Sequence, residues 1–289
     1  MLQEKREQLL TLAGETETKE LPLGDSILAA WVRSICQTLR GCGIEPEPLL
    51  ERAGLDRSLL GVPWARYPAT QVRRLWEQVL SETEDPLIGM RCGQDMQVAT
   101  LYSLGLAVVT SRSLSQVLDL VARYAKIISS TMDISLSHNH AGTTLRLRTL
   151  KGTEPGASAS LAMLAFILRQ ANSLSHHKVT PTAVGVCLPH LPETDRKRLD
   201  RHFGVAVDTS AECAHIPFAY PDTIEPYASA NAILREVTEE LSIEYLNRVR
   251  QASFASRAEE VMTKLLANGQ PRIKEVADAM HLSSRTLQR

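Results

Sequence analysis

The spacing between apolar residues changes along the chain, from a period of about 3.6 residues to a period of 2. Early in the chain, apolar residues recur at three- and four-residue steps ahead of two glycines: Ile27, Leu28, Trp31, Ile35 and Leu39, then Gly41 and Gly43. From Ile134 to Thr149 apolar and polar residues alternate instead, on both sides of the turn at Ala141-Gly142. The first pattern is typical of an amphipathic helix and the second of a β-hairpin. We therefore predict an α+β fold and not a repeating βαβ fold.

The same patterns predict the other elements of one folded body, residues 25–225. Helices are expected over residues 48–53, 70–80, 86–92, 101–109, 113–128, 157–173 and 193–202, and strands over 182–188, 205–207 and 213–217. Ser113 and Gln116 are spaced as in a capping box at the start of one of these helices. Residues 1–24 mix Glu, Lys, Thr and Gly, which predicts a tail or a short peripheral helix.

Composition excludes several classes of protein. Of the 289 residues, 44% are hydrophobic and 22% are charged, which is typical of a globular protein and not of a disordered or fibrous one. Lys and Arg number 32 against 33 Asp and Glu, so any DNA binding must be local and not driven by bulk charge. No apolar run approaches the roughly 20 residues of a membrane span. The charged N-terminus lacks the apolar core of a signal peptide, so a cytoplasmic protein is expected.

Cysteines and histidines do not form a disulfide or metal pattern. The five cysteines are scattered without a C-x-x-C pair, which favours reduced, mostly buried thiols: Cys36, Cys42, Cys92, Cys187 and Cys213. His138 and His140 lie on one side of a predicted strand but lack a third ligand, and His176-His177 ends a predicted helix, so neither a metal site nor a cofactor is predicted. The sequence has no nucleophile elbow, phosphate loop or dinucleotide fingerprint, and we predict no enzymatic activity.

A long helix is predicted over residues 228–250. Six apolar residues lie close to one stripe of this helix: Ile233, Leu234, Val237, Leu241, Tyr245 and Val249. Glu239, Glu240 and Glu244 occupy the rest of its surface. The stripe fits a helix packed on its own domain, and it also fits a dimer seam, which needs the same near-heptad spacing. Residues 226–254 are thus predicted to be a linker helix, with candidate dimer contacts at Leu234, Val237, Leu241, Tyr245 and Val249.

Residues 255–289 are predicted to form a separate helical unit. Ser256 is placed to cap a first helix, a second helix covers residues 273–280, and Ser283 is placed to cap a third. Short helices joined by a three- to four-residue turn, with the small Ala277 at their crossing, are typical of a helix-turn-helix. A plain three-helix packing unit has much of the same apolar pattern.

The third helix of this unit offers hydrogen-bond donors to DNA. Arg285, Gln288 and Arg289 lie on the face away from the core and suit guanine or adenine edges or phosphates. From residue 255 onward, six Lys and Arg oppose four Asp and Glu, a net charge of +2, so the rest of the chain carries −3. A C-terminal segment that is more positive than the rest of the chain is expected if this segment binds DNA.

These residues resemble a known family. The segment IKEVADAMHLSSRTLQR, residues 273–289, is similar to the first helix-turn-helix of the AraC/XylS family of transcriptional regulators. The resemblance covers roughly residues 25–289 and includes the arabinose-binding-like N-terminal domain of one branch of that family. The upstream residues that carry it are Ile44 through Leu55, Arg66-Tyr67-Pro68, Val72, Leu75-Trp76, Asp85-Pro86, Gly89, Gly93, Leu104-Gly105, Ser113-Leu114, Arg123-Tyr124, the strand after Pro181, and His202-Phe203-Gly204.

The resemblance implies a DNA-binding regulator with a sensor and dimerisation domain at residues 25–225, a linker helix, and the first part of a DNA-binding domain at residues 255–289. It implies base contacts from Arg285, Gln288 and Arg289, and a phosphate contact from Ser283 or Ser284. The implied partners are double-stranded DNA, a second copy of the chain and a small-molecule effector. Four polar residues flanked by apolar helical stretches are candidates for lining an effector pocket: Arg91, Tyr102, Arg123 and Tyr124. Tyr124 also fits a core position, and Arg123 a surface position.

One departure from the family concerns the C-terminal end. Family members have two helix-turn-helix units, and this sequence stops at Arg289, inside the first recognition helix. We expect the natural chain to be longer, and residues 1–289 alone to bind an operator weakly or not at all, because one of two tethered modules is missing. A small-molecule-processing enzyme and a protein-interaction module are the alternative functions. An enclosed cleft with a Ser or Cys hydrogen-bonded to a His would favour the enzyme.

Overall fold

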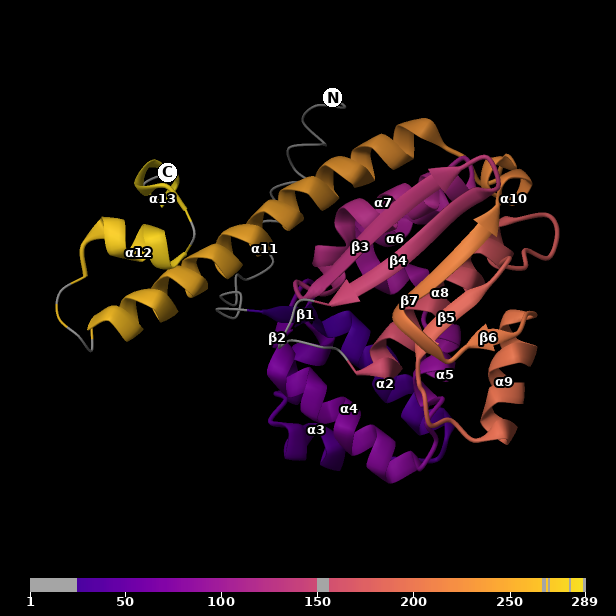
Figure 1. Cartoon of the computed structure of the whole chain (residues 1–289), viewed down its shortest axis with the longest axis horizontal. Helices are drawn as coiled ribbons and strands as arrows, with labels where there is room; N and C mark the ends of the chain where they lie inside the picture. The colour runs from indigo at the N-terminus through magenta and orange to yellow at the C-terminus, as the bar shows by residue number, and fades with distance from the viewer. Residues whose placement is uncertain (1–24, 150–155, 267–268, 270, 281, 288–289) are drawn as a thin grey trace.

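The computed structural model describes residues 25–149, 156–266, 269, 271–280 and 282–287. Figure 1 shows a body built from helices and a β-sheet, and a long helix that crosses the body and ends at two short helices beside it. Helices and sheet contribute to one large apolar core in the body. The short helices have a small apolar cluster of their own. The predicted α+β fold is confirmed.

A five-stranded sheet has the strand order β3-β4-β7-β5-β6. Its strands are β3 (Met132–Asn139), β4 (Gly142–Thr149), β5 (Val184–Cys187), β6 (Val207–Asp208) and β7 (Ser210–Ala219). The predicted hairpin is confirmed, because β3 and β4 pair in register from Met132 with Thr149 to Asn139 with Gly142. Strand β7 pairs antiparallel with both β4 and β5, and β6 pairs parallel with β5. The last strand in sequence therefore joins the hairpin to the rest of the sheet.

Helices make up most of the rest of the body. They are α2 (Ala29–Gly41), α3 (Glu47–Ala53), α4 (Ala69–Thr83), α5 (Ile88–Asp95), α6 (Tyr102–Val109), α7 (Leu114–Ile128), α8 (Ala157–Leu174), α9 (Glu193–Phe203) and α10 (Tyr220–Ile224), with single 3₁₀ turns at Arg57–Gly61 and Val98–Leu101. A small antiparallel sheet joins β1 (Ser26–Leu28) to β2 (Arg66–Pro68). The predicted capping box at α7 is wrong: Ser113 makes no side-chain cap, and Gln116 accepts a hydrogen bond from the backbone N–H of Arg112 at 2.9 Å.

Two glycines let helices α5 and α8 approach each other closely. Gly89 and Gly93 are one turn apart on α5, and both are buried. A Cβ atom at Gly89 would lie 2.1 Å from the carbonyl oxygen of Ser158, and one at Gly93 would lie 2.0 Å from that of Ala162. These carbonyls belong to the backbone of α8, so only glycine fits at either position.

The C-terminal part consists of α11 (Ala232–Leu266), α12 (Ile273–Ala279) and α13 (Ser284–Leu287). Helix α11 has 35 residues and continues through Ser256. The expectation that a new helix starts at Ser256 is therefore wrong, because residues 251–256 contain neither glycine nor proline to stop a helix. Among the described residues, no helix is long and apolar enough to cross a membrane.

The cysteines of the described chain are free thiols. Cys36 and Cys92 are buried, Cys42 and Cys213 are partly buried, and Cys187 is exposed. Burial raises the pKa of Cys36 to about 11 and that of Cys92 to about 12, so both remain protonated at neutral pH.

Candidate functional site on the long helix

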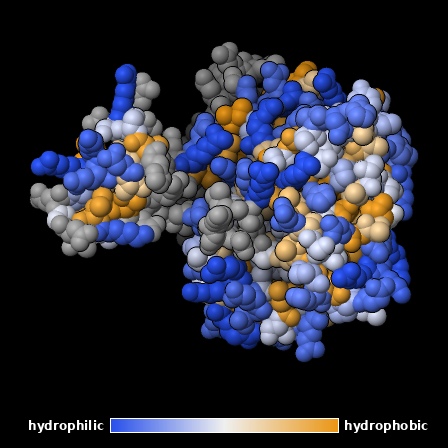
Figure 2. Space-filling model, in the orientation of Figure 1, coloured by the Kyte–Doolittle hydropathy of each residue, from blue (hydrophilic) through white to orange (hydrophobic). Residues whose placement is uncertain are grey.

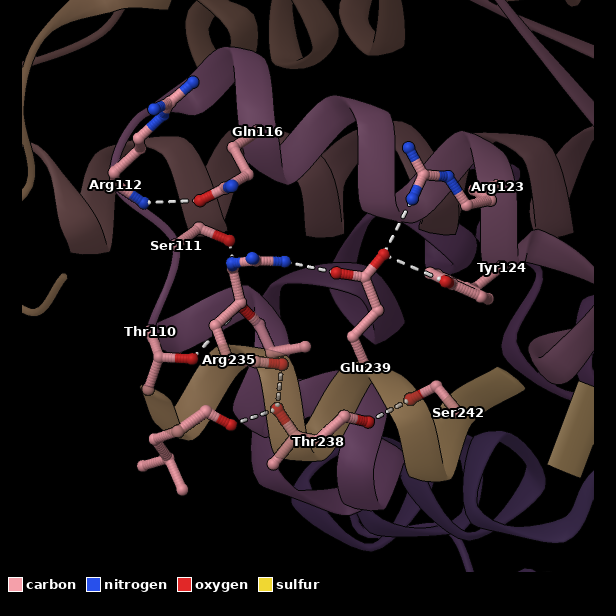
Figure 3. Close-up of polar contacts among 12 residues, drawn as sticks. Thr110, Ser111, Arg112, Gln116, Arg123, Tyr124, Arg235, Thr238, Glu239 and Ser242 are labelled. Atoms are coloured by element: carbon pink, nitrogen blue, oxygen red, sulfur yellow. Dashed lines mark hydrogen bonds and ion pairs between the residues drawn. The ribbon is translucent and has the colours of Figure 1, made fainter. Parts of the chain in front are cut away.

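Glu239 joins the first half of α11 to helix α7. Its Oε1 atom accepts hydrogen bonds from Arg123 Nη1 at 2.7 Å and from the Tyr124 hydroxyl at 2.9 Å, and its Oε2 atom accepts one from Arg235 (Figure 3). Only 13% of the Glu239 side chain is exposed. Burial, and then the hydrogen bond to Glu239, raise the pKa of Tyr124, so the phenol stays protonated as a donor.

A second contact, further along α11, centres on Tyr245. The centroid of its ring lies 4.2 Å from that of the Trp64 ring. The centroid of the Trp64 ring lies 4.5 Å from that of the Tyr102 ring. The Tyr245 hydroxyl donates a hydrogen bond to the Trp64 carbonyl at 2.9 Å. Trp64 and Tyr102 have φ angles of 61° and 54°, a region that non-glycine residues rarely adopt. Two of the three described non-glycine residues with positive φ thus lie where α11 packs on the body, and the third, Glu84, ends α4.

Arg66 lies beneath this contact and is 3% exposed. Its guanidinium donates to the Ser26 hydroxyl and the Ser26 carbonyl, both at 2.8 Å, and to the carbonyl of Ile127. It also reaches the Tyr245 hydroxyl at 3.4 Å. None of these partners is a carboxylate, so the buried charge is stabilised by dipoles from β1, α7 and α11. Arg66 thus ties three separate segments together.

The crossing of α6 and α11 is lined by small residues. Ser103 on α6 and Ser242 on α11 are both buried, and their hydroxyl oxygens are 2.9 Å apart. The start of α11 is fixed by the loop after α6, because the Asn231 N–H donates to the Thr110 carbonyl at 3.0 Å. The Asn231 side chain in turn caps the helix by accepting from the Leu234 N–H at 3.0 Å. The N-terminal half of α11 is thus anchored on the body from Asn231 to Tyr245.

The C-terminal end of α11 holds the two short helices. Val276 of α12 and Met280, which directly follows this helix, are buried against Ala258 of α11, with Val261 and Leu265 packed beside them. Leu282 completes this cluster, and its N–H donates to the carbonyl of the fully buried Ala277 at 2.8 Å. Ala277 thus lies inside α12, and its small side chain is fully buried. Figure 1 shows this end of α11 extending away from the sheet.

The predicted DNA contacts lie at the end of the chain. Arg285 is an exposed residue of α13, Ser284 is partly buried, and Ser283 is exposed just before the helix. Gln288 and Arg289 lie outside the described residues.

The four candidate pocket residues lie in two separate places. Arg123 and Tyr124 both bind Glu239, and Tyr102 stacks on Trp64, so these three belong to the contact between the body and α11. Arg91 is exposed on α5, where it donates to the Gly41 carbonyl at 3.3 Å. The structure thus places them at a helix interface and at a separate surface site.

The predicted dimer stripe divides into two parts. Tyr245 and Val249 are buried against the body, at 7% and 3% exposure, so they do not face a partner and their assignment to a seam is wrong. Leu241 is partly buried. Leu234 and Val237 are 42% and 38% exposed, and the neighbouring Ile233 is 78% exposed. The stripe is therefore packed on its own domain at Tyr245 and Val249 and is exposed at Leu234 and Val237.

A serine and a histidine approach each other at the end of α8. The Ser175 hydroxyl lies 3.3 Å from His177 Nδ1, and His177 Nε2 lies 2.9 Å from Asp222. The Ser175 hydroxyl donates a hydrogen bond to Glu225, however, and the group lies on an exposed turn. Hydrogen bonds to Asp222 and then Glu225 raise the pKa of His177, which suits an ion pair and not a neutral general base. The arrangement does not meet the requirements of an activated nucleophile.

The described residues contain no group of three or more His, Cys, Asp and Glu that could hold a metal ion. His138 lies on β3, where its Nδ1 atom is 3.1 Å from the Thr143 hydroxyl on β4, and His140 lies in the turn after β3.

Sequence reasoning missed the role of two residues. Glu239 was expected on the outer surface of its helix, although its position four residues after Arg235 indicated an intrahelical ion pair. Arg66 has no local sequence signal for burial, because its partners come from β1, α7 and α11, distant in sequence.

Comparison with known proteins agrees with the resemblance in the sequence. A family model for the arabinose-binding N-terminal domain of AraC transcription regulators matches residues 43–222. The fold is similar to the crystal structure of transcriptional regulator CdpR from Pseudomonas aeruginosa, with a TM-score of 0.53 and 15% identity over 89% of this chain and 76% of that chain. At this identity the likeness concerns the fold alone. A sequence comparison with curated proteins gives no match.

Proposed function

Because this chain belongs to the AraC family of transcription regulators that carry an arabinose-binding N-terminal domain, we propose that it binds DNA through its C-terminal helices in response to a ligand of the body. The observation that carries the proposal is the continuity of α11. One unbroken helix is anchored on the body by Glu239, Ser242 and Tyr245 and packs against α12 at its other end.

The proposed mechanism is a shift between two positions of α11 on the body. An effector changes DNA binding only if its affinity differs between the two positions. The Glu239 contact is suited to such a shift, because its partners Arg123 and Tyr124 lie on α7 and Arg235 lies on α11 itself. If α11 moves, Glu239 exchanges its bonds to α7 for water while the bond to Arg235 is kept.

We predict that Glu239→Gln loosens α11 on the body. The amide keeps an acceptor for Tyr124 but loses the charge that strengthens the bonds from Arg123 and Arg235. Because Arg123 is largely exposed, we expect a loss of only about 1 kcal/mol, which is roughly a fivefold faster amide exchange over residues 232–245. Hydrogen exchange read by mass spectrometry measures this, with Glu236→Gln, an exposed glutamate on the same helix, as the control. Equal exchange in the two variants would contradict a role for Glu239.

The proposed DNA contact is made by α13. Arg285 is exposed there, and the packing of α12 on α11 leaves α13 at the outer end of the molecule. Ser283, Ser284, Gln288 and Arg289 are proposed as further contacts on the strength of the family resemblance.

Arg285→Ala is expected to weaken sequence-specific DNA binding by about 1–3 kcal/mol, roughly 5- to 150-fold. The loss reflects the two donors that an arginine presents to a guanine edge. Selection of duplexes from a random pool, followed by fluorescence anisotropy on the enriched sequence, measures it. Arg201→Ala removes the same charge from an exposed site on α9 and is expected to leave the affinity unchanged. An Arg285→Ala variant that bound the enriched sequence as tightly as the unsubstituted chain would contradict the proposed contact.

We propose that a second copy of the chain packs on the start of α11. Ile233, Leu234 and Val237 form the exposed part of the stripe, and Tyr220 and Ile224 of the preceding α10 are also 52% exposed. Exposed apolar residues in such proximity are typical of a protein interface. A monomer in light scattering at high protein concentration would contradict this part of the proposal.

A further inference from the structure

A cavity of about 420 Å³ lies at the rim of the five-stranded sheet, away from the α11 contacts. Its walls come from the end of β4, the start of α8, and the strands β5 and β7. The volume is within the range of sites for small molecules. None of Arg91, Tyr102, Arg123 and Tyr124 lines it.

The walls of the cavity carry one positive and one negative side chain. Arg148 projects from β4 and Glu212 from β7, and both are exposed. Neither makes a hydrogen bond or an ion pair to another described residue. The neighbouring Arg146, by contrast, donates to the Ser137 hydroxyl at 2.6 Å. The cavity therefore offers a guanidinium and a carboxylate to a ligand.

The first turn of α8 adds backbone N–H groups beside the positive charge of Arg148. Gly156 and Ala157 line the cavity, and the helix has no side-chain cap and no acidic residue in its first turn. The free N–H groups of an 18-residue helix favour an anion there. Together with the planar fork of Arg148, they suit a carboxylate.

The floor of the cavity is apolar. Leu147, Val186 and Ala214 line it and are each less than 7% exposed. We propose that the cavity binds a small aliphatic α-amino acid, with its carboxylate on Arg148, its ammonium on Glu212 and its side chain on this floor. The proposal names the effector class of the sensing domain, and so it rests on the proposed function.

Two thiols provide a direct measure of occupancy. Cys187 and Cys213 line the cavity, and Cys42 at the end of α2 does not. A ligand in the cavity shields the first two from alkylation by iodoacetamide and leaves Cys42 unaffected. The rate at each cysteine is measured by mass spectrometry on the full chain, with L-valine, L-leucine and L-norleucine as probes at millimolar concentration.

We expect at least one probe to slow alkylation of Cys187 and Cys213. Leucinamide lacks the carboxylate and isocaproate lacks the ammonium group, and each is expected to protect with at least about tenfold lower affinity than leucine. Arg148→Gln is expected to weaken protection by about the same factor, and Arg146→Gln, on the same face of β4, to leave it unchanged. Glu212→Gln is expected to remove the preference for leucine over isocaproate.

Three results would overturn the proposal: no protection by any probe, equal protection by leucine and its two analogues, or unchanged protection in Arg148→Gln. The assay contains no DNA, so a negative result leaves the DNA-binding proposal intact. If the selection of DNA sequences fails, the alkylation assay still tests the binding of an amino acid, because it does not depend on DNA binding.

Discussion

Gly93→Ala is expected to destabilise the body by at least about 3 kcal/mol, the largest effect of any single methyl group that we predict. In an ordinary helix this change is stabilising by about 1 kcal/mol. Here the new Cβ would lie 2.0 Å from the Ala162 carbonyl oxygen and 2.9 Å from the Ala165 Cβ. The first atom belongs to the backbone of α8 and the second is the Cβ atom of an alanine, so no change of rotamer can relieve the clash. Helix α5 must therefore separate from α8. Urea unfolding followed by circular dichroism measures the loss.

Gly61→Ala is the matched control. No atom lies within 4 Å of the Cβ position there, and the φ angle is not in the left-handed region. A neutral or slightly stabilising effect is expected. If Gly93→Ala behaved in the same way, the close packing of α5 on α8 would be wrong.

Arg66→Met is expected to cost about 3–5 kcal/mol of unfolding free energy. Methionine fills much of the volume but donates no hydrogen bond, so the Ile127 carbonyl and the Ser26 hydroxyl lose this buried donor, and the Ser26 carbonyl keeps only the bond from the Ser130 N–H. Arg66→Lys keeps the charge, but a single ammonium group cannot reach β1, α7 and Tyr245 at once, so most of the loss is expected to remain. Urea unfolding measures both variants.

Arg33→Met provides the comparison. Arg33 is partly buried and donates one hydrogen bond, to the Leu60 carbonyl at 3.0 Å, and its loss is expected to cost about 1 kcal/mol. Similar losses for the two methionine variants would show that Arg66 contributes only as an ordinary surface arginine does.

The sequence predicted the elements that depend on local pattern. The hairpin from Ile134 to Thr149 was found because its apolar residues alternate and its turn contains Gly142. Helix α8 was found because its apolar stretch is longer than any strand. The position of β7 between β4 and β5 could not be found in this way, because strand order depends on contacts between residues far apart in sequence.

The candidate site was predicted in part. The small Ala277 and the exposed Arg285 follow from helix-turn-helix spacing, which is local. The extent of α11 beyond residue 254 was missed because Ser256 also fits a helix start, and nothing in a single sequence decides between a cap and an interior position. Arg148 and Glu212 were not singled out, since their strands are not adjacent in sequence.

The length of α11 gives small motions of the body a large effect at the far end. Helix α11 is buried against the body as far as Val249, and the stretch from Val249 to Leu266 measures about 25 Å at 1.5 Å per residue. A tilt of this stretch by about 8° displaces its end by about 3.5 Å. Under the proposed function, such a displacement is close to the spacing of successive base pairs in a DNA duplex.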